Sequence, residues 1–424
     1  MIAADVVVVG AGPAGIAAAT AAAELGQLVL VLDDNPSAGG QIWRGLGAQG
    51  GAKGKALQRF ARSGAELLTG CRVFDVPAPN VLHAFREDSG KAIAVRYRQL
   101  VLATGARERF LPFPGWTLPG VFGVGGLQAL AKGGLSVRGK RVVVAGSGPL
   151  LLAVGAFLRS AGAEVVSVAE QASEGKLAGF SVSLWSEPVK LMQGLKYRIA
   201  LGGVPYRTGC WPVEALAGSD GLSLRGVRLT NGRRSWEESC DLLACGFHLI
   251  PNTELAQLLG CAFDGDFVRV DADQRTSKPD VFCVGEPTGI GGLDAALVQG
   301  EIAGLVCAKQ PARSLQRRAN AGRRFAAQLE KAFALRPELK TIARPETIVC
   351  RCEDVLLSEL EGQSEFREAK IQTRCGMGAC QARICGPALG FLFNWKQTSV
   401  RPPVFPVPLE ALCMNDDEKI EEKA

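Results

Sequence analysis

Histidine is almost absent from the sequence, which has only His83 and His248 among its 424 residues. This scarcity excludes a metal site built from several histidines and argues against a Ser-His-Asp triad. The 52 glycines follow no collagen-like period, so we expect them at turns and close backbone approaches. The net charge of +6 is too small to indicate nucleic-acid binding, and no nucleic-acid partner is expected.

The beginning of the chain also lacks the features of a targeting segment. The 18 residues from Val6 to Ala23 carry no charge, but Asp5 stands where a signal peptide would have lysine or arginine. Three glycines and a proline within this run make it a poor membrane span. We therefore expect a cytoplasmic protein with reduced thiols, in which clustered cysteines indicate a metal or redox site rather than disulfides.

A dinucleotide-binding fingerprint opens the chain. The strand-like run 5–9 leads into Gly10-Ala-Gly-Pro-Ala-Gly15, and an alanine-rich helix follows. A second strand-like run, 28–32, then ends at an acid, 23 residues after the first glycine. In this pattern the glycines allow a tight turn, approach to a pyrophosphate and close helix packing, and the acid accepts from ribose hydroxyls. The residues predicted to bind the dinucleotide here are Gly10, Gly12, Pro13, Ala14, Gly15 and Asp33.

Three later segments look like further cofactor-binding backbone. Gly39-Gly-Gln41 can lie flat against a bulky ligand because its glycines have no side chains. The strand-like run 99–103 ends in a turn of small residues, and the run 280–284 ends in a glycine and an acid ahead of a helix. A helix N-terminus behind that acid can support binding of a ribityl chain and a pyrimidine edge. These segments add Gly40, Gln41, Ala103, Thr104, Gly105, Gly285 and Glu286 to the predicted site.

A second fingerprint begins at residue 141. The strand-like run 141–145 leads into Gly146-Ser-Gly148, and the next strand-like run ends at Glu170. The interval of 24 residues nearly repeats the first one, but Leu151 stands where the third glycine belongs. Gly146 and Gly148 are therefore predicted cofactor-binding residues of a site that either holds a nucleotide or keeps only the fold.

The order of these motifs resembles the flavoproteins with two dinucleotide-binding domains, the disulfide-reductase-like family. The resemblance implies an α/β fold, with FAD in a discontinuous domain of residues 1–116 and 246–310. It implies a second nucleotide, NAD(P), ATP or FMN, at or near residues 117–245. No Cys-x-x-Cys pair precedes residue 350. We interpret the seven earlier cysteines as small core residues, which disfavours thiol–disulfide chemistry.

Residues 311–344 are predicted to form a basic helical linker. The stretch 309–344 has ten lysines and arginines against two acids, without an aromatic stacking pattern. A solvated helix or a subunit-docking face therefore explains it better than RNA binding.

Five cysteines are concentrated near the C-terminus. Cys350-Arg-Cys352 forms one pair, and Cys375, Cys380 and Cys385 follow within eleven residues. Four convergent thiolates suit either a [2Fe–2S] cluster or Zn²⁺. The flavin motifs favour the iron–sulfur cluster, because a one-electron centre beside a two-electron carrier has a chemical purpose that structural zinc lacks.

The run Thr373-Arg-Cys-Gly-Met-Gly-Ala-Cys-Gln-Ala-Arg-Ile-Cys385 resembles the bacterioferritin-associated-ferredoxin-like [2Fe–2S] domain of heteromeric amino-acid dehydrogenases. Proteins of this kind are the α subunit of D-hydroxyproline dehydrogenase, the A subunit of opine oxidase and the flavoprotein subunit of hydrogen cyanide synthase. Segments 107–109, 113–120 and 401–403 extend the resemblance. It implies a cluster domain at 345–410, followed by a charged tail at 411–424. The ligands implied by the resemblance are Cys350, Cys352, Cys380 and Cys385, with Cys375 as an extra cysteine.

The same resemblance implies the biological role. The chain would be a flavin-dependent oxidoreductase subunit for CH–NH donors, passing electrons between FAD and the cluster, with no catalytic side chain of its own identified. It implies an FAD-containing β subunit of amino-acid-oxidase type, a small ferredoxin-like γ subunit, and a downstream acceptor, which could hold the chain at the inner membrane. Arg107 and Arg109 are candidates for holding anionic cofactor groups. The alternatives are a self-sufficient NAD(P)H-dependent reductase and a non-catalytic assembly subunit.

Overall fold

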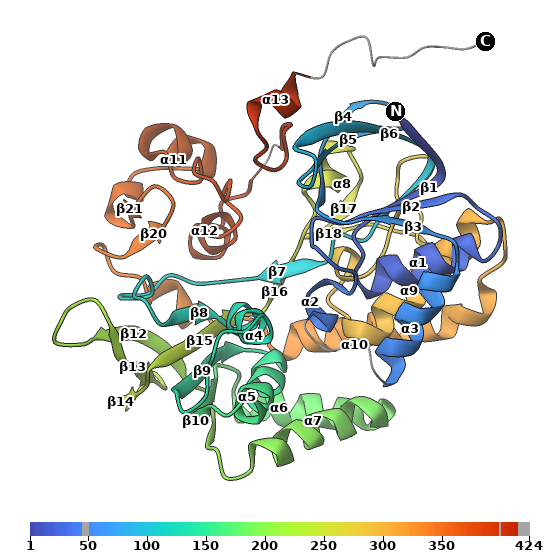
Figure 1. Cartoon of the computed structure of the whole chain (residues 1–424). Helices are drawn as coiled ribbons and strands as arrows, with labels where there is room; N and C mark the ends of the chain where they lie inside the picture. The colour runs from blue at the N-terminus through green and yellow to red at the C-terminus, as the bar shows by residue number, and fades with distance from the viewer. Residues whose placement is uncertain (45–50, 398–399, 414–424) are drawn as a thin grey trace. The chain divides into compact units, whose positions relative to one another are not determined.

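The computed structural model describes residues 1–44, 51–397 and 400–413 (Figure 1). The chain divides into two compact units, each assembled from separate stretches. The first unit contains residues 1–107, 251–327 and 399–424, and the second contains residues 108–250 and 328–398. The predicted charged tail lies outside the described residues from position 414 onward.

The first unit is built on a seven-stranded sheet in the order β3-β2-β1-β6-β5-β4, with β19 also paired to β6. Strands β3, β2, β1, β6 and β19 run parallel, and β4, β5 and β6 form an antiparallel meander. The strands are β1 (Ile2–Val9), β2 (Val29–Leu32), β3 (Glu66–Leu68), β4 (Cys71–Ala78), β5 (Val81–Arg86), β6 (Lys91–Leu102) and β19 (Val281–Cys283).

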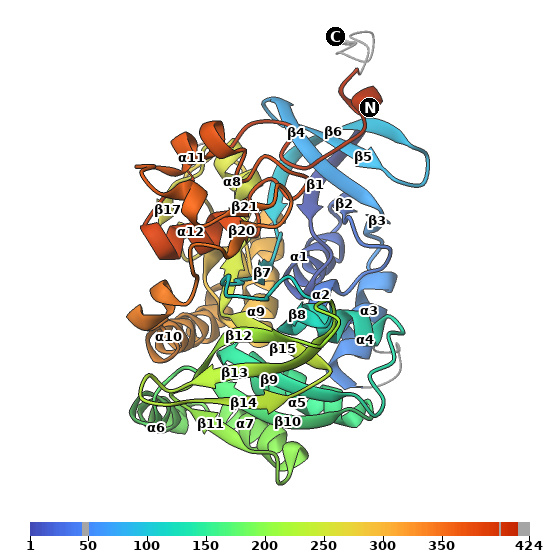
Figure 2. The same cartoon turned by 90° about the vertical axis from the view of Figure 1, so that its left-hand side faces the viewer.

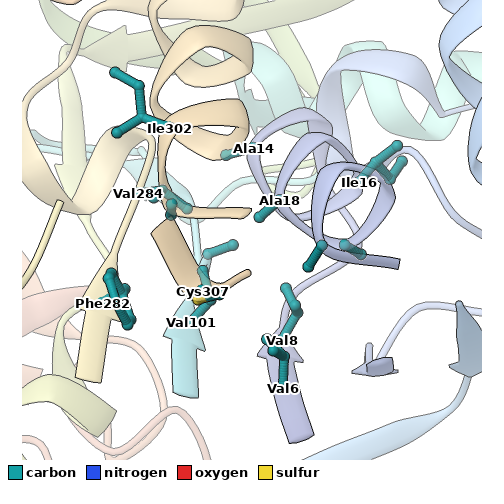
Figure 3. Close-up of a cluster of buried hydrophobic side chains, with 14 of the residues drawn as sticks. Val6, Val8, Ala14, Ile16, Ala18, Val101, Phe282, Val284, Ile302 and Cys307 are labelled. Carbon is teal, nitrogen blue, oxygen red and sulfur yellow. The ribbon is translucent and has the colours of Figure 1, made fainter. Parts of the chain in front are cut away.

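Helices α1 (Pro13–Ala23) and α9 (Gly292–Cys307) pack against each other and against this sheet. Figure 3 shows the core between them, in which alanines of α1 meet β-branched residues of β1 and Ile302 of α9. Small residues on both helices allow this close approach. A Cβ added to Gly300 of α9 would lie 2.1 Å from the carbonyl oxygen of Ala14 in α1. The smaller elements of the unit are α2 (Gly40–Trp43), α3 (Gly51–Arg62), α8 (Glu254–Leu258), β17 (Phe263–Asp264), β18 (Phe267–Val268), two 3-10 turns (Glu286–Thr288, Arg313–Leu315) and α13 (Leu409–Leu412).

The second unit has a parallel five-stranded sheet in the order β11-β10-β9-β15-β8, visible in Figure 2 with its neighbouring hairpins. One face is covered by α4, α5 and α7, and the other by the antiparallel sheet β12-β13-β14. The elements are β8 (Val121–Gly123), α4 (Val124–Lys132), β9 (Arg141–Ser147), α5 (Leu150–Ser160), β10 (Glu164–Glu170), α6 (Glu174–Ser183), η1 (Leu184–Ser186), α7 (Pro188–Leu201), β11 (Tyr206–Thr208), β12 (Trp211–Ala217), β13 (Leu224–Thr230), β14 (Ser235–Ser239) and β15 (Leu242–Phe247).

A small C-terminal subdomain completes the second unit with its own core, which includes Leu360, Phe366 and Leu389. The chain passes between the units along β7 (Ala106–Glu108), β16 (Leu249–Pro251) and α10 (Gln316–Ala332). The subdomain contains a 3-10 turn (Pro337–Thr341), β20 (Ile348–Cys350), β21 (Val355–Leu356), another 3-10 turn (Ser358–Leu360), α11 (Phe366–Thr373) and α12 (Cys385–Phe393). Among the described residues, no helix is both long and apolar enough to cross a bilayer.

Candidate flavin site and cysteine centre

The glycine turn after β1 has the geometry that the fingerprint predicts. Gly10 adopts φ +106°, and a Cβ there would lie 2.3 Å from the Ala103 carbonyl oxygen. A Cβ on Gly15 would lie 1.8 Å from the Gly10 carbonyl oxygen, so helix and turn can meet only through glycine. Gly12 differs, because a Cβ there would enter open space. This leaves an open space in front of Gly12, between the turn and the start of the following helix.

Helix α1 begins at this open space with Pro13 in its first turn and no side-chain cap on its N-terminus. Its first N–H groups and the positive end of its dipole are therefore suited to an anion. Asp33 at the end of β2 is nearly buried and accepts hydrogen bonds from the N–H groups of Ala11 and Asn35. These bonds orient the carboxylate at the edge where a ribose would lie.

The other predicted flavin segments border the same turn. Gly40 has φ +56°, and its added Cβ would lie 3.0 Å from the Gly12 Cα. Gln41 follows in α2 and is exposed. Thr104 is tied to Asn252: its hydroxyl donates to the Asn252 carbonyl oxygen at 2.6 Å, and the Asn252 amide donates to the Thr104 carbonyl oxygen at 2.9 Å. Asn252 thus positions the turn at Gly105, a role that the sequence did not reveal.

Glu286 makes a contact within the protein that the sequence did not indicate. Its carboxylate accepts from the N–H of Gly292 at 3.0 Å and therefore caps the start of α9. The N–H of Gly285 donates to the Gln299 side chain at 2.7 Å. Arg107, predicted to hold an anionic cofactor group, forms an ion pair with Glu254 at 2.9 Å.

The second fingerprint also forms its turn. A Cβ on Gly146 would lie 1.8 Å from the Gly246 carbonyl oxygen, which explains the glycine at that position. Leu151, in place of the third glycine, is fully buried between the sheet and its helices. Glu170 has no exposed surface, and it accepts from the N–H groups of Gly148 and Ala172, each at 2.8 Å. Burial raises the pKa of Glu170 to about 7 in spite of these bonds.

A segment after α10 covers the edge at which β9 and β10 end. The Ser147 hydroxyl donates to the Phe333 carbonyl oxygen at 3.0 Å, and the Gln171 amide donates to the Ser147 hydroxyl at 2.9 Å. The N–H of Arg336 donates to the Gln171 side chain at 3.3 Å, and its guanidinium lies 4.1 Å from the Trp211 ring centroid. The ends of β9 and β10 are therefore covered by the chain itself.

We expect Glu170 to make the unfolding free energy fall as pH rises from about 4.5 to 7. The folded pKa of about 7 exceeds the ordinary value of 4.5, so in this window the folded chain holds a proton that the unfolded chain has released. Glu170→Gln should remove this part of the slope. Urea unfolding at several pH values measures this slope. The pH dependence of the unfolding free energy is compared between the two proteins, and not its absolute value, because the substitution also changes hydrogen bonds. An unchanged slope in the variant would contradict this prediction.

The C-terminal cysteines converge from three segments. Cys350 ends β20, Cys375 follows α11 and Cys385 begins α12. The sulfurs of these three lie within 4.8 Å of one another, and all three residues are buried. The thiols of Cys375 and Cys385 donate hydrogen bonds toward Cys350 and lower its pKa to about 2. The contact with Cys350 raises the pKa of Cys375 to about 12, and the contacts with Cys350 and Cys375 raise that of Cys385. The three thiols therefore share one negative charge until a metal displaces their protons.

The four predicted ligands share a pocket of about 310 Å³ in the second unit. Cys350, Cys352, Cys380 and Cys385 line this pocket, whereas Cys375 does not. Cys375 is fully buried in the core of the subdomain, a core to which Cys350 and Cys385 also belong. The pocket lining thus contains the four cysteines that the resemblance names, whereas the distances between sulfurs group Cys375 with Cys350 and Cys385.

Aromatic and acidic residues line the rest of the pocket. Phe110, Trp116 and Phe122 supply rings, and the Trp116 indole donates to the Ile348 carbonyl oxygen at 2.6 Å. Glu108 accepts hydrogen bonds from the N–H groups at the start of α4, while burial raises its pKa to about 7. Sequence reasoning missed Glu108 as a lining residue, although it lies between the two arginines that carried the resemblance. Arg109 belongs to the second unit, unlike Arg107.

The seven earlier cysteines are all buried. Burial raises the pKa of Cys71 to about 11 and those of Cys210, Cys240 and Cys307 to about 12. Cys240 and Cys245 have a Cys-x4-Cys spacing, but both lie in the second unit, away in sequence from the flavin segments. Such buried, high-pKa thiols are unreactive, in agreement with their interpretation as core residues.

The two glycine turns, each between a parallel strand and a helix, are those of a two-domain dinucleotide-binding fold. The model of the pyridine nucleotide-disulphide oxidoreductases matches residues 4–300, and the chain belongs to that family. Within it, the sequence is 33% identical to hydrogen cyanide synthase subunit HcnB of Pseudomonas aeruginosa, covering 89% of this chain and 90% of that protein. It is 32% identical to the A subunit of opine oxidase from Rhizobium meliloti (strain 1021), covering 96% and 97%. The resemblance to subunits of this type and the α/β class predicted from sequence are confirmed.

Solved structures show the same fold. L-proline dehydrogenase from P. horikoshii superimposes with a TM-score of 0.70 at 18% identity, covering 97% of this chain and 80% of that one. Thioredoxin reductase from T. acidophilum gives a TM-score of 0.54 at 22% identity, covering 73% and 99%. The family and the open cradle at Gly12 together imply an FAD-dependent oxidoreductase.

Proposed function

We propose that this chain is the FAD- and [2Fe–2S]-containing electron-transfer subunit of a heteromeric amino-acid dehydrogenase. The observation that carries the proposal is a pocket whose lining includes Cys350, Cys352, Cys380 and Cys385, in a chain that also has a flavin cradle. The relatives from hydrogen cyanide synthase and opine oxidase are named as subunits, which supports partners for this chain too. The donor would be an amino acid of the D-hydroxyproline, proline, opine or glycine type.

Bound FAD would accept two electrons and release them singly to the cluster. The chain's part is positioning: the turn at Gly10 and Gly12, the N-terminus of α1 and Asp33 would hold the dinucleotide. The four cysteines would hold the iron. The N–H of Gly376 lies 3.4 Å from the Cys350 sulfur, and such donors to sulfur raise the reduction potential of a cluster.

The substrate would be oxidised on a separate β subunit of amino-acid-oxidase type, with a small ferredoxin-like γ subunit completing the complex. Electrons would leave for an acceptor, which could keep a cytoplasmic complex at the inner membrane. A second nucleotide, whether NAD(P), ATP or FMN, would have to bind beside the covered ends of β9 and β10 or in the pocket lined by Phe110, Trp116 and Phe122.

The test is anaerobic reduction of the purified chain. NADH or NADPH at micromolar concentration should leave the flavin oxidised. The segment around Phe333 covers the ends of β9 and β10, and the carboxylate of Glu170 already accepts from the N–H groups of Gly148 and Ala172. Photochemical reduction of the flavin should then produce the paramagnetic signal of a reduced [2Fe–2S] cluster.

The rival functions predict other results. Rapid bleaching by NADH or NADPH would support a self-sufficient reductase. A colourless chain without iron would support a non-catalytic assembly subunit. A reduced flavin without any cluster signal, in protein of full iron content, would contradict the proposed electron route.

A further inference from the structure

Among the five cysteines between residues 350 and 385, Cys375 alone does not line the pocket. It has no exposed surface, yet its sulfur lies within 4.8 Å of the sulfurs of Cys350 and Cys385. The other four cysteines line the pocket, so the iron and the bridging sulfides of a cluster would lie there. Cys375 therefore contacts two of the predicted ligands without facing the pocket.

The chain makes a sharp turn at Cys375. Helix α11 ends at Thr373, whose hydroxyl oxygen accepts from the N–H of Cys375 at 3.2 Å. Gly376 has φ +79°, and a Cβ there would lie 2.9 Å from atoms of the Phe366 and Ala382 side chains. Only glycine fits this crowded place with a positive φ. The turn at Gly376 thus sets the position of Cys375.

Two hydrogen-bond donors from this turn reach the same sulfur. The nitrogen of the Gly376 N–H lies 3.4 Å from the Cys350 sulfur, and the thiol of Cys375 also donates toward that sulfur. A thiol that binds no metal carries its proton at neutral pH and is a weak donor. Cys375 can therefore remain a donor when Cys350 binds a metal as a thiolate.

We propose that Cys375 is a positioning residue for the iron–sulfur cluster: its thiol donates a hydrogen bond to the Cys350 ligand and thereby raises the reduction potential of the cluster. Reduction adds negative charge to the cluster and its ligand sulfurs. A donor to a ligand sulfur therefore stabilises the reduced form more than the oxidised form. This role rests on the [2Fe–2S] function proposed above and concerns a cysteine that is not itself a ligand.

Two other roles fit Cys375 less well. Four cysteines already line the pocket, and four thiolates are the number that a [2Fe–2S] cluster takes. Cys375 could bind iron only in place of one of them, after its sulfur had turned toward the pocket. Mere filling of the core does not account for its position either, because the sulfurs of Cys350 and Cys385 are polar partners within reach.

The test compares Cys375→Ala, which removes the donor, with Cys375→Ser, which keeps one as a hydroxyl. Iron content is measured in each full-length protein, and reductive titration followed by paramagnetic resonance gives the midpoint potential of the cluster. In Cys375→Ala the ratio of reduced to oxidised cluster at a fixed potential should fall about fivefold, a shift of about 40 mV for one electron. In Cys375→Ser the ratio should equal or exceed that of the wild type, because a hydroxyl is a stronger donor than a thiol.

The matched control is Cys240→Ala, which removes a buried thiol from the same unit but from a different hydrophobic core. The cluster of this variant should have the wild-type potential. The control therefore separates the loss of the donor to Cys350 from the general effect of removing a thiol from a core.

Equal potentials in the wild type and Cys375→Ala would overturn the proposal. A potential in Cys375→Ser as low as that of Cys375→Ala would also overturn it, because repacking would then explain the shift. Loss of iron from either variant would do the same, since Cys375 would then bind the metal or support its site. A wild type without iron would overturn the proposed function together with this inference, whereas the other results would leave the proposed function intact.

Discussion

Gly12→Val should yield a folded protein that purifies without flavin. Gly12 has φ −72° and ψ 180°, which valine adopts readily, and nothing lies within 4 Å of the added Cβ. The new side chain would therefore meet no protein atom at its first carbon and would fill the space in front of α1 where the pyrophosphate belongs. We expect at least a hundredfold loss of FAD affinity, which corresponds to about 2.7 kcal/mol.

Flavin absorbance per mole of protein measures this effect, and circular dichroism with thermal unfolding reports the fold. Gly203→Val is the matched control, since its added Cβ also meets nothing within 4 Å and the residue is exposed. Gly15→Ala should behave differently and fail to fold, because its Cβ would overlap the Gly10 carbonyl oxygen. A Gly12→Val protein with a full complement of flavin would show that the cradle at α1 is not the FAD site.

Cys380→Ser and Cys385→Ser should each abolish the [2Fe–2S] centre while the FAD remains bound. Both residues line the pocket shared by the predicted ligands, and the flavin segments belong to the other unit. Serine is a poor ligand for iron–sulfur clusters, which are held by thiolates. Iron content and the paramagnetic resonance spectrum of the reduced protein should fall to background in both variants.

Cys375→Ser is the matched control, and it should keep the cluster. Cys375 does not line the pocket, although its sulfur lies within 4.8 Å of those of Cys350 and Cys385. The neighbouring Cys350 together with burial raises the pKa of Cys375 to about 12. The expected change is a modest loss of stability from a hydroxyl in an apolar place. Loss of iron in Cys375→Ser with retention in Cys385→Ser would make Cys375 the fourth ligand. Zinc without iron in the wild type would contradict the redox assignment itself.

The strands that carry the nucleotide motifs could be predicted from the sequence because their signals are local. The run predicted at 28–32 is observed as Val29–Leu32, and the run predicted at 141–145 is observed as Arg141–Ser147. These strands are buried on both faces, so they consist of continuous valines and leucines. The meander strands β4 and β5 and the sheet β12-β13-β14 were not predicted, since their partly exposed strands mix polar and apolar residues without a clear period.

The parts of the site that depend on distant partners could not be found in this way. Thr104 and Asn252 are 148 residues apart, and Gln171 and Phe333 are 162 residues apart. No spacing rule connects such pairs, whereas glycines at positive φ and paired cysteines have local signatures. The contact between the Glu286 carboxylate and the N–H of Gly292 was also not predicted, because a carboxylate can bind either a ligand or the N-terminus of a helix.

The interleaved order of the two units has a consequence for biosynthesis. The fingerprint strand β1 leaves the ribosome first, but β19 and α9, which complete its sheet and core, follow only after Pro251. The N–H of Val404 donates to the Phe74 carbonyl oxygen at 2.8 Å, so the first unit gains its last contact near the end of the described chain. The sheet and core beside the cradle are complete only after Cys307 has been made, so we expect the flavin to be captured late in synthesis or after it.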